Sequence, residues 1–216
     1  KMEVIIVKKL CFYFSSVILV FTLLFGISAC SGKKASQPLS VGILPDVDSI
    51  PVIIAQQKGY FEKEGLDIKV EKFTSASDRD SALQAGKIDG AISDILAAAF
   101  FCEGGFEIKI TSMTNGSYKM LAGKHIGEVS IADLKGKSIA ISKNTIIEYA
   151  ADKMLAENNM KPEDVNKTVI PQMPVRLEML KNGKVDAATL PEPLASSAVN
   201  SGAVILNSTD KLGINP

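Results

Sequence analysis

A nine-residue pattern that occurs twice constrains the fold of this chain more than any other feature of its sequence. Residues 83–91 read LQAGKIDGA and residues 180–188 read LKNGKVDAA, with five identities at an offset of 97 positions. In each copy the glycine follows a helix-like run and precedes a strand-like one, which suits a glycine that ends a helix with positive φ. Nine residues could agree by chance between two α/β units, so the flanking segments must decide.

Strand-like and helix-like segments alternate through both halves of the chain. The first half predicts strands at 39–44, 66–73, 88–92 and 107–113, and helices at 49–61, 78–85 and 95–104. The second half predicts strands at 137–141, 167–170, 185–190 and 203–206, and helices at 145–159, 175–182 and 191–202. Alternating β and α segments imply parallel sheets with right-handed crossovers. We therefore expect an α/β protein of two small three-layer lobes, joined near residues 114–118.

Local signals refine this prediction. Ser77 and Asp80 match a capping box, and Pro191 suits the first position of a helix because it lacks an N–H. The offset of 97 also aligns Arg79 with Arg176 and the loop 74–76 with the loop 171–173. The repeat is therefore longer than nine residues, and chance agreement is a poor explanation.

The first 38 residues are expected to lie outside the fold. A short basic start, an uncharged run over 10–29 and small residues before Cys30 are typical of a secretory signal. The small residues before Cys30 resemble the lipobox of bacterial lipoproteins, which implies that Cys30 carries lipid (palmitate among its acyl chains) after removal of residues 1–29. Residues 30–38 then form a tether. The alternative is an uncleaved membrane anchor, since twenty apolar residues can span a bilayer.

Composition excludes several classes of protein. The chain has 24 basic and 24 acidic residues, and removal of residues 1–29 leaves 21 basic against 23 acidic residues. Without a basic patch, a nucleic-acid partner is not expected. Of the three cysteines, Cys11 leaves with the signal and Cys30 carries lipid, so Cys102 has no disulfide partner and is expected to pack in the core.

Four segments resemble one family of transport proteins. They are GYFEKEGLDIKVEKF at 59–73, SALQAGKIDGAISD at 81–94, KGKSIAI at 135–141 and LPEPLA at 190–195. Together they look like the solute-binding proteins of ABC importers, in the group that serves nitrate, alkanesulfonates, taurine and the aminopyrimidine precursor of thiamine. No single segment is diagnostic, and the order and spacing of the four carry the resemblance.

The resemblance implies a two-lobed, type II periplasmic-binding-protein-like fold in which each lobe is a small mixed or parallel sheet with flanking helices. It implies a monomer outside the cytoplasmic membrane, with a small-molecule ligand and with ABC permease and ATPase subunits as partners. In that family the chain returns from the second lobe to complete the first. We therefore expect an incomplete first lobe at 39–115, a second lobe at 116–206 and the start of the return at 207–216.

Ligands of open α/β sheets bind outside the carboxyl ends of the strands, which here places the site between the lobes. The predicted ligand-binding residues, which follow strands or lie between the lobes, are Asp46, Ser49, Ser75, Asp94, Asn115, Ser142, Asn144, Thr145, Gln172 and Glu192. Most open a helix, so ordinary capping is the alternative for each. The carboxylates would repel a bare oxoanion, which favours an amine-bearing ligand. Tyr118 and Phe73 are candidates for stacking on an aromatic ligand.

The sequence has few histidines and cysteines, two residue types that often carry catalysis. The one histidine, His125, and one internal cysteine cannot build a Ser-His-Asp set or a zinc site, so we expect no catalytic residue, metal or cofactor. Asp89 and Asp186, the repeated aspartates, are expected to stabilise turns. Two alternatives stay open: an enzyme of thiamine-pyrimidine biosynthesis with the same fold, and an extracellular ligand-sensing module.

Overall fold

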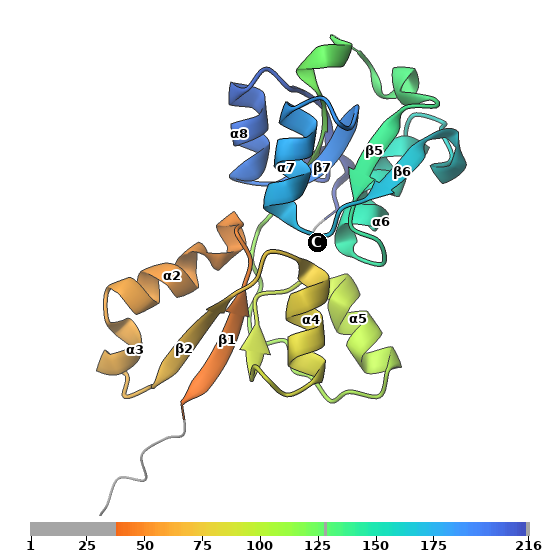
Figure 1. Ribbon diagram of the computed structural model, residues 1–216. Coiled ribbons are helices and arrows are strands. Elements are labelled where there is room, and N and C mark those ends of the chain that lie inside the picture. The colour runs from red at the N-terminus through yellow and green to blue at the C-terminus, as the bar shows by residue number, and fades with distance from the viewer. Residues whose placement is uncertain (1–37, 128, 215–216) are drawn as a thin grey trace, which may run out of the picture. The chain divides into compact units, whose positions relative to one another are not determined.

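The computed structural model describes residues 38–127 and 129–214 of the chain, which form two α/β lobes (Figure 1). The predicted signal at 1–29, the lipidated Cys30 and the tether, except Pro38, lie outside the described residues. None of the helices in the described part of the chain combines the length and the hydrophobicity that a membrane span requires.

The first lobe is a three-stranded parallel sheet of order β2-β1-β3 with four helices. Its elements are β1 (Leu39–Ile43), α2 (Ile50–Gln57), α3 (Tyr60–Lys63), β2 (Ile68–Lys72), α4 (Ala76–Gln84), β3 (Gly90–Ala91) and α5 (Ile95–Glu103). Gly42 lies where β1 passes under α4, and a Cβ atom there would come within 2.6 Å of Ile88 and 3.1 Å of Phe73. Glycine at this position therefore permits close packing of the sheet against its neighbours.

The second lobe is a five-stranded sheet of order β6-β5-β7-β4-β8, in which β4 runs antiparallel to both neighbours. Its strands are β4 (Tyr118–Ala122), β5 (Ser138–Ile141), β6 (Asn166–Val169), β7 (Ala187–Pro191) and β8 (Val204–Ser208). Its α-helices are α6 (Ile146–Ala156), α7 (Met173–Lys181) and α8 (Leu194–Asn200). The sheet is thus mixed, and β4 is a strand that the sequence pattern did not predict.

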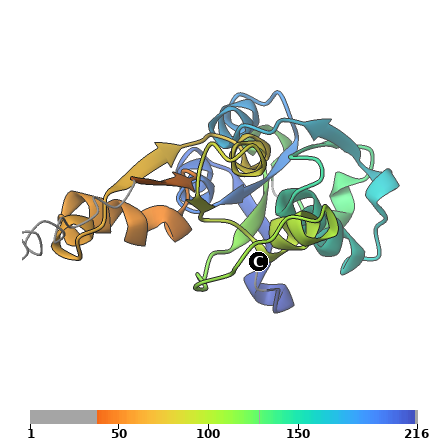
Figure 2. The same ribbon diagram turned by 90° about the horizontal axis from the view of Figure 1, so that it is seen from below.

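Side chains alternate between two cores on the faces of this second sheet. Ile139 and Ile141 of β5 pack with α6, whereas Ala140 between them packs in the cluster that includes α7 and α8. Figures 1 and 2 show α6 on one face of the sheet and α7 with α8 on the other. The period of two along a strand explains why one short strand serves both cores.

Three sequence predictions about the place of an element or the burial of a residue are wrong. Residues 106–117, which are described throughout, form neither helix nor strand, so the strand predicted at 107–113 is absent. A strand needs a hydrogen-bonded neighbour, and among the described residues no strand pairs with this segment. Pro191 ends β7, where it lies opposite Tyr118 of β4, instead of opening a helix, because pairing with β4 extends the strand to this residue and α8 begins only at Leu194. Cys102 is exposed and not in the core, because it lies on the outer side of α5.

Candidate functional site

Asp46 and Ser49 follow β1 and fasten a single 3₁₀ turn, η1 (Val47–Ser49). Asp46 Oδ1 accepts hydrogen bonds from the Ser49 N–H at 3.1 Å and from the Ser49 hydroxyl at 2.8 Å. The Ser49 oxygen in turn accepts the Leu44 N–H at 3.2 Å. Burial raises the pKa of the Asp46 carboxyl, and the hydrogen bonds from Ser49 oppose part of the rise. These two candidates therefore hold the end of β1 in shape.

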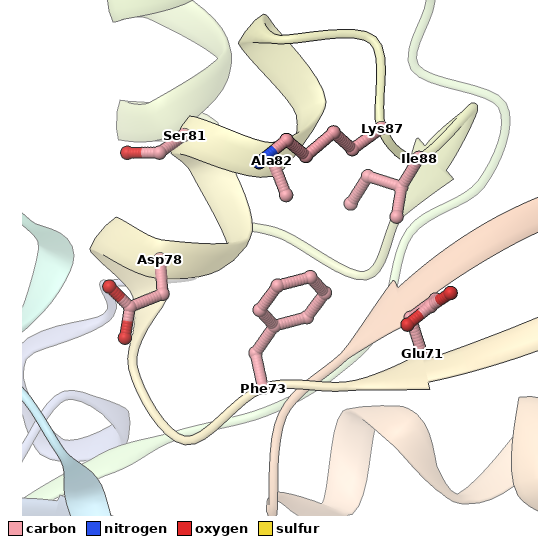
Figure 3. Close-up of a pocket in the computed structure, with 7 residues that line it drawn as sticks. All are labelled: Glu71, Phe73, Asp78, Ser81, Ala82, Lys87 and Ile88. Carbon is pink, nitrogen blue, oxygen red and sulfur yellow. The ribbon is translucent and has the colours of Figure 1, made fainter.

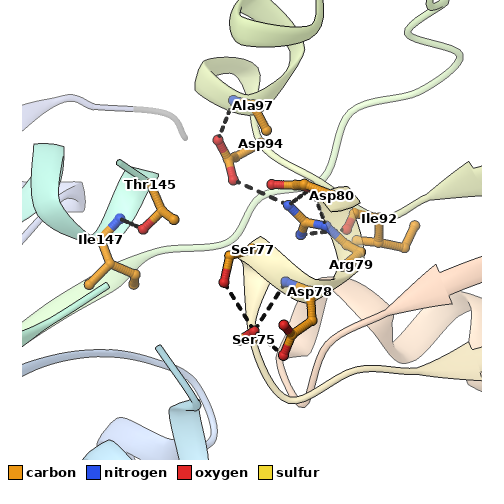
Figure 4. A network of polar contacts seen from close by, with 10 residues as sticks. All are labelled: Ser75, Ser77, Asp78, Arg79, Asp80, Ile92, Asp94, Ala97, Thr145 and Ile147. Carbon is orange, nitrogen blue, oxygen red and sulfur yellow. Dashed lines mark hydrogen bonds and ion pairs between the residues drawn. The ribbon is translucent and has the colours of Figure 1, made fainter. Parts of the chain in front are cut away.

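Ser75 follows β2 and caps α4, with its oxygen accepting the Asp78 N–H at 3.2 Å (Figure 4). Its hydroxyl donates to Asp78 Oδ2 at 2.6 Å. The capping box predicted at Ser77 and Asp80 is wrong by two residues, because Ser75 has the extended backbone of a helix cap whereas Ser77 lies inside α4.

Asp94 follows β3 and caps α5, where its Oδ1 accepts the Ala97 N–H at 2.9 Å (Figure 4). Its second oxygen lies 3.8 Å from Nη2 of Arg79, whose side chain is 2% exposed. Arg79 also bonds Asp80 Oδ1 through Nε at 2.8 Å. Burial raises the pKa of Asp80, against the lowering effect of Arg79. Arg79 therefore partly balances the charges of Asp80 and Asp94.

Ser142, Asn144 and Thr145 follow β5 and lead into α6. Thr145 Oγ1 accepts the Ile147 N–H at 3.3 Å and donates to the Ser142 carbonyl at 2.8 Å, which makes it the cap of this helix. Asn144 has a positive φ of 58°, and its N–H donates to Glu148 at 2.8 Å. The side chains of Ser142 and Thr145 are buried, whereas Asn144 is exposed.

Gln172 and Glu192 follow β6 and β7. Gln172 stands at the start of α7 and makes no side-chain cap. Glu192 accepts hydrogen bonds from Lys119 Nζ and, at 3.0 Å, from the Ser196 N–H. Burial tends to raise the pKa of Glu192, but these hydrogen bonds outweigh it and the pKa is lowered. Glu192 is therefore a carboxylate already paired with a lysine.

The loops that carry four of these candidates meet between the lobes. The Met173 N–H donates to the Thr74 carbonyl at 2.9 Å, and the Val47 N–H donates to the Glu192 carbonyl at 3.0 Å. These bonds join the loop of Gln172 to the loop of Ser75, and the loop of Asp46 to Glu192.

Apolar side chains reinforce this contact. Leu44, Ala76 and Met173 form a buried cluster, with Phe73 and Leu194 packed against it. The buried Tyr118, at the start of β4, lies close enough to Asp94 and Asp46 for their charges, after burial, to raise the pKa of its hydroxyl. Strand ends from both lobes therefore meet at one place, and Tyr118 lies beside them.

Other predicted residues lie apart from this contact. Asn115 lies exposed in the segment 106–117. His125 lies beside Asp186, with 3.3 Å between His125 Nε2 and Asp186 Oδ1, at the amino ends of β5 and β7 and hence at the opposite edge of the second sheet. Asp186 also accepts hydrogen bonds from the N–H and hydroxyl of Ser138, as Asp89 does from Ser40. The repeated aspartates thus have the structural role that the sequence predicted.

A cavity of about 410 Å³ opens in the first lobe, between the end of β2 and α4 (Figure 3). Its apolar part is formed by Phe73, Ala82 and Ile88, and polar side chains of Glu71, Asp78, Ser81 and Lys87 surround it. None of the ten predicted ligand residues lines it, but Phe73, the candidate for stacking, lines it and also packs against the apolar cluster between the lobes. Among the described residues, no group of three His, Cys, Asp or Glu side chains could hold a metal ion.

Two buried arginines were not predicted as site residues, although the repeat aligned them. Arg79 Nη1 donates to the Ile92 carbonyl at 2.9 Å, and Arg176 Nε donates to the Thr189 carbonyl at 3.0 Å. Ile92 and Thr189 are separated by the same 97 positions as the arginines. An arginine on an otherwise apolar helix face, repeated at this offset, was the signal that could have identified them.

Comparisons with known proteins agree with this architecture. Residues 46–193 match the family model described as NMT1/THI5 like. The chain is 29% identical over 211 residues to a Brachyspira hyodysenteriae protein named as an ABC transporter periplasmic binding protein, covering 88% of this chain and 61% of that protein. It is 30% identical over 119 residues to the 4-amino-5-hydroxymethyl-2-methylpyrimidine phosphate synthase THI11 of Saccharomyces cerevisiae, covering 53% of this chain and 34% of that enzyme.

Among solved structures, the alkanesulfonate-binding protein SsuA from Xanthomonas axonopodis pv. citri, bound to MOPS, superposes with a TM-score of 0.68 and 23% identity. The match covers 82% of this chain and 62% of that one, and it shows the two-lobed periplasmic-binding-protein fold. The chain spans about six-tenths of the length of these binding proteins. Since the family model matches more than half of the residues, the chain belongs to the NMT1/THI5-like family.

Proposed function

We propose that this protein is the extracytoplasmic substrate-binding component of an ABC importer and captures a small polar nutrient between its lobes. The observation that carries the proposal is the meeting of strand-end loops from both lobes, through Met173–Thr74 and Val47–Glu192. Ligands of open α/β sheets bind at such strand ends. Similarity to a protein named as an ABC transporter periplasmic binding protein supports the same role.

In the proposed mechanism, the lobes separate and close about the crossing near residues 114–118, and the closed form is presented to permease and ATPase subunits. The closed lobes would bury polar groups around the ligand, so a compound that leaves one of them unpaired should bind poorly. We propose that the protein acts as a monomer that is anchored outside the membrane through lipidated Cys30. Metabolic labelling with palmitate, compared between the wild type and Cys30→Ser, tests the anchor.

An enzymatic role is the alternative, and the similarity to the yeast synthase favours it over part of the chain. The position of the one histidine opposes it, since His125 lies at the amino ends of the strands, away from the loops that meet. We therefore propose a non-enzymatic binding role. A binding protein should return every bound compound chemically unchanged, which mass spectrometry of the released ligand checks.

Candidate ligands are an alkanesulfonate, taurine, nitrate or an aminopyrimidine, and the balance of charges distinguishes them. Asp46 has a raised pKa, and Asp94 and Glu192 face Arg79 and Lys119. A carboxylate that already has a cationic partner can still accept a hydrogen bond from an amine, whereas it offers no donor to a bare oxoanion. We therefore favour an amine-bearing ligand.

The first experiment is a thermal-shift titration of the purified protein with nitrate, methanesulfonate, taurine and an aminopyrimidine. A ligand at a hundred times its dissociation constant should add about 2.7 kcal/mol to the free energy of unfolding. A shift with only taurine or the aminopyrimidine, weakened in Asp94→Asn or Glu192→Gln, would support contacts to these carboxylates. A shift with nitrate or methanesulfonate would assign the contacts to the helix starts at Ser75, Asn144 and Thr145. No shift with any compound would contradict the proposed ligand class.

A further inference from the structure

The guanidinium of Arg176 connects the ends of two strands of the second lobe. Arg176 lies in the second turn of α7, and its side chain is fully buried, with 0% exposure. Nε donates to the Thr189 carbonyl in β7 at 3.0 Å, and Nη1 donates to the Ile170 carbonyl at the end of β6 at 2.7 Å. A weaker bond at 3.4 Å reaches the Pro171 carbonyl. One planar group therefore fixes the distance between the two strand ends.

The loops that leave these strand ends are the two that contact the first lobe. The loop after Ile170 contains Met173, whose N–H donates to the Thr74 carbonyl. The segment after Thr189 contains Glu192, whose carbonyl accepts the Val47 N–H. Both backbone hydrogen bonds between the lobes thus begin within three residues of a carbonyl that Arg176 holds.

A contribution to stability does not explain why an arginine is buried at position 176. No carboxylate forms an ion pair with Arg176 among the described residues, whereas Asp80 and Asp94 lie beside Arg79, its counterpart in the repeat. Burial lowers the pKa of Arg176 to about 10. A buried cation without a counter-charge is unfavourable, and apolar side chains of similar volume often replace buried charges without loss of stability. The feature that an apolar side chain could not reproduce is the fork of hydrogen bonds to the two strand ends.

We infer that Arg176 is a positioning residue that holds the loop 170–173 and the end of β7, with the following Glu192, in the arrangement that contacts the first lobe. The inference rests on the proposed function only because these segments also carry the candidate ligand residues Gln172 and Glu192. Loss of the fork lets the loop 170–173 and Glu192 move independently, while the sheet and the cores on its faces remain in place.

Hydrogen exchange of the full protein without ligand tests this inference in Arg176→Met and Arg176→Lys. In both variants the Met173 and Val47 amides should exchange about tenfold faster, which corresponds to the net loss of one buried hydrogen bond. The amides of β5, such as those of Ile139 and Ala140, should keep their wild-type rates. Val47 belongs to the first lobe, so a purely local effect of the substitution would not change its exchange rate.

Leu180→Ala provides the matched control, because Leu180 lies one turn further along α7 and is 1% exposed. This variant should accelerate exchange broadly in the second lobe, including β5, without selecting Met173 and Val47. Wild-type exchange at both amides in Arg176→Met would overturn the inference. Wild-type exchange in Arg176→Lys would overturn the role of the fork, since the charge alone would then suffice. The same selective pattern in Leu180→Ala would reduce the effect to general loosening. This experiment uses no ligand, so its result can be interpreted even if the proposed binding function is wrong.

Discussion

Ser75, Asp94 and Thr145 each accept a hydrogen bond from the first turn of the helix that follows. These contacts satisfy donors that every helix start leaves unpaired. A carboxylate retains further acceptor sites, so capping and ligand contact are compatible at Asp94. The residue types at the strand ends were predictable from the sequence. Their partners were not predictable, because only folding brings Arg79 near Asp94 and Lys119 near Glu192.

Gly42 provides the sharpest stability prediction for a single residue. A Cβ atom at this position would lie 2.6 Å from Ile88 Cδ1, 3.1 Å from Phe73 Cε2 and 3.3 Å from Arg79 Cγ. Gly42→Ala should therefore lower the free energy of unfolding by about 1–3 kcal/mol through overpacking, measured by urea denaturation. Gly90→Ala, in the neighbouring strand with nothing within 4 Å of its Cβ, is the control and should change stability little. Equal effects of the two substitutions would contradict the packing argument.

The repeated element LxxGK(I/V)DxA has a physical explanation in its aspartate. Asp89 accepts the N–H and hydroxyl of Ser40 at the start of β1, and Asp186 accepts those of Ser138 at the start of β5. Each aspartate thus ties the segment after a helix to the first residues of the central strand of its repeat. The pattern predicted a structural role from sequence alone, because local geometry is the same in both copies.

Stability at acid pH should report these ties. Hydrogen bonds from the Ser40 N–H and hydroxyl lower the pKa of Asp89 below its usual 3.8. Burial opposes, but hydrogen bonds from Ser138 and His125 outweigh it and lower the pKa of Asp186. A carboxylate with a lowered folded-state pKa stabilises above its unfolded-state pKa, and the contribution is lost as pH falls through the folded-state value.

The stability difference between wild type and Asp89→Asn or Asp186→Asn should therefore shrink from about pH 5 to about pH 3. Urea denaturation across this range measures it. Asp67→Asn, an exposed carboxylate of the first lobe, is the control, and its difference from the wild type should stay small. A difference for Asp89→Asn that grows as the pH falls would refute the assigned sign.

Helices and strands were predictable where the hydrophobic periodicity and the length of a segment agreed. They were not predictable where pairing with a distant strand determines whether a strand forms. The strands β1, β2, β5, β6 and β7 and the helices α4 to α8 occur within a few residues of the predicted ranges. The segment 107–113 has a strand-like sequence but forms no strand, and β4 forms a strand because β7 and β8 flank it. Backbone pairing of this kind depends on distant segments, so local sequence does not determine it.

At the scale of the whole molecule, the two lobes differ in how much apolar surface they bury. Among the described residues, the second lobe holds clusters of 15 and 11 buried apolar residues on the two faces of its sheet. The first lobe contributes seven buried apolar residues, and α2 has none. Ile50 and Ile54 of α2 are 45% and 44% exposed, and Ile110 and Met113 beyond β3 are 60% and 81% exposed. Because burial of apolar surface is the main stabilising contribution, the first lobe should be the less stable one.

We therefore predict that the protein unfolds in two steps, with residues 39–91 exposed to exchange at lower urea concentration than residues 118–208. Hydrogen-exchange mass spectrometry in increasing urea separates the two transitions. Gly42→Ala should lower only the first midpoint. Leu180→Ala, which leaves a cavity in the second lobe and removes about 2–5 kcal/mol, should lower only the second. A single midpoint that both substitutions shift equally would mean that the Met173–Thr74 and Val47–Glu192 contacts couple the lobes more strongly than their separate cores divide them. Two midpoints with the opposite order would show that exposed apolar residues are no guide to the stability of the first lobe.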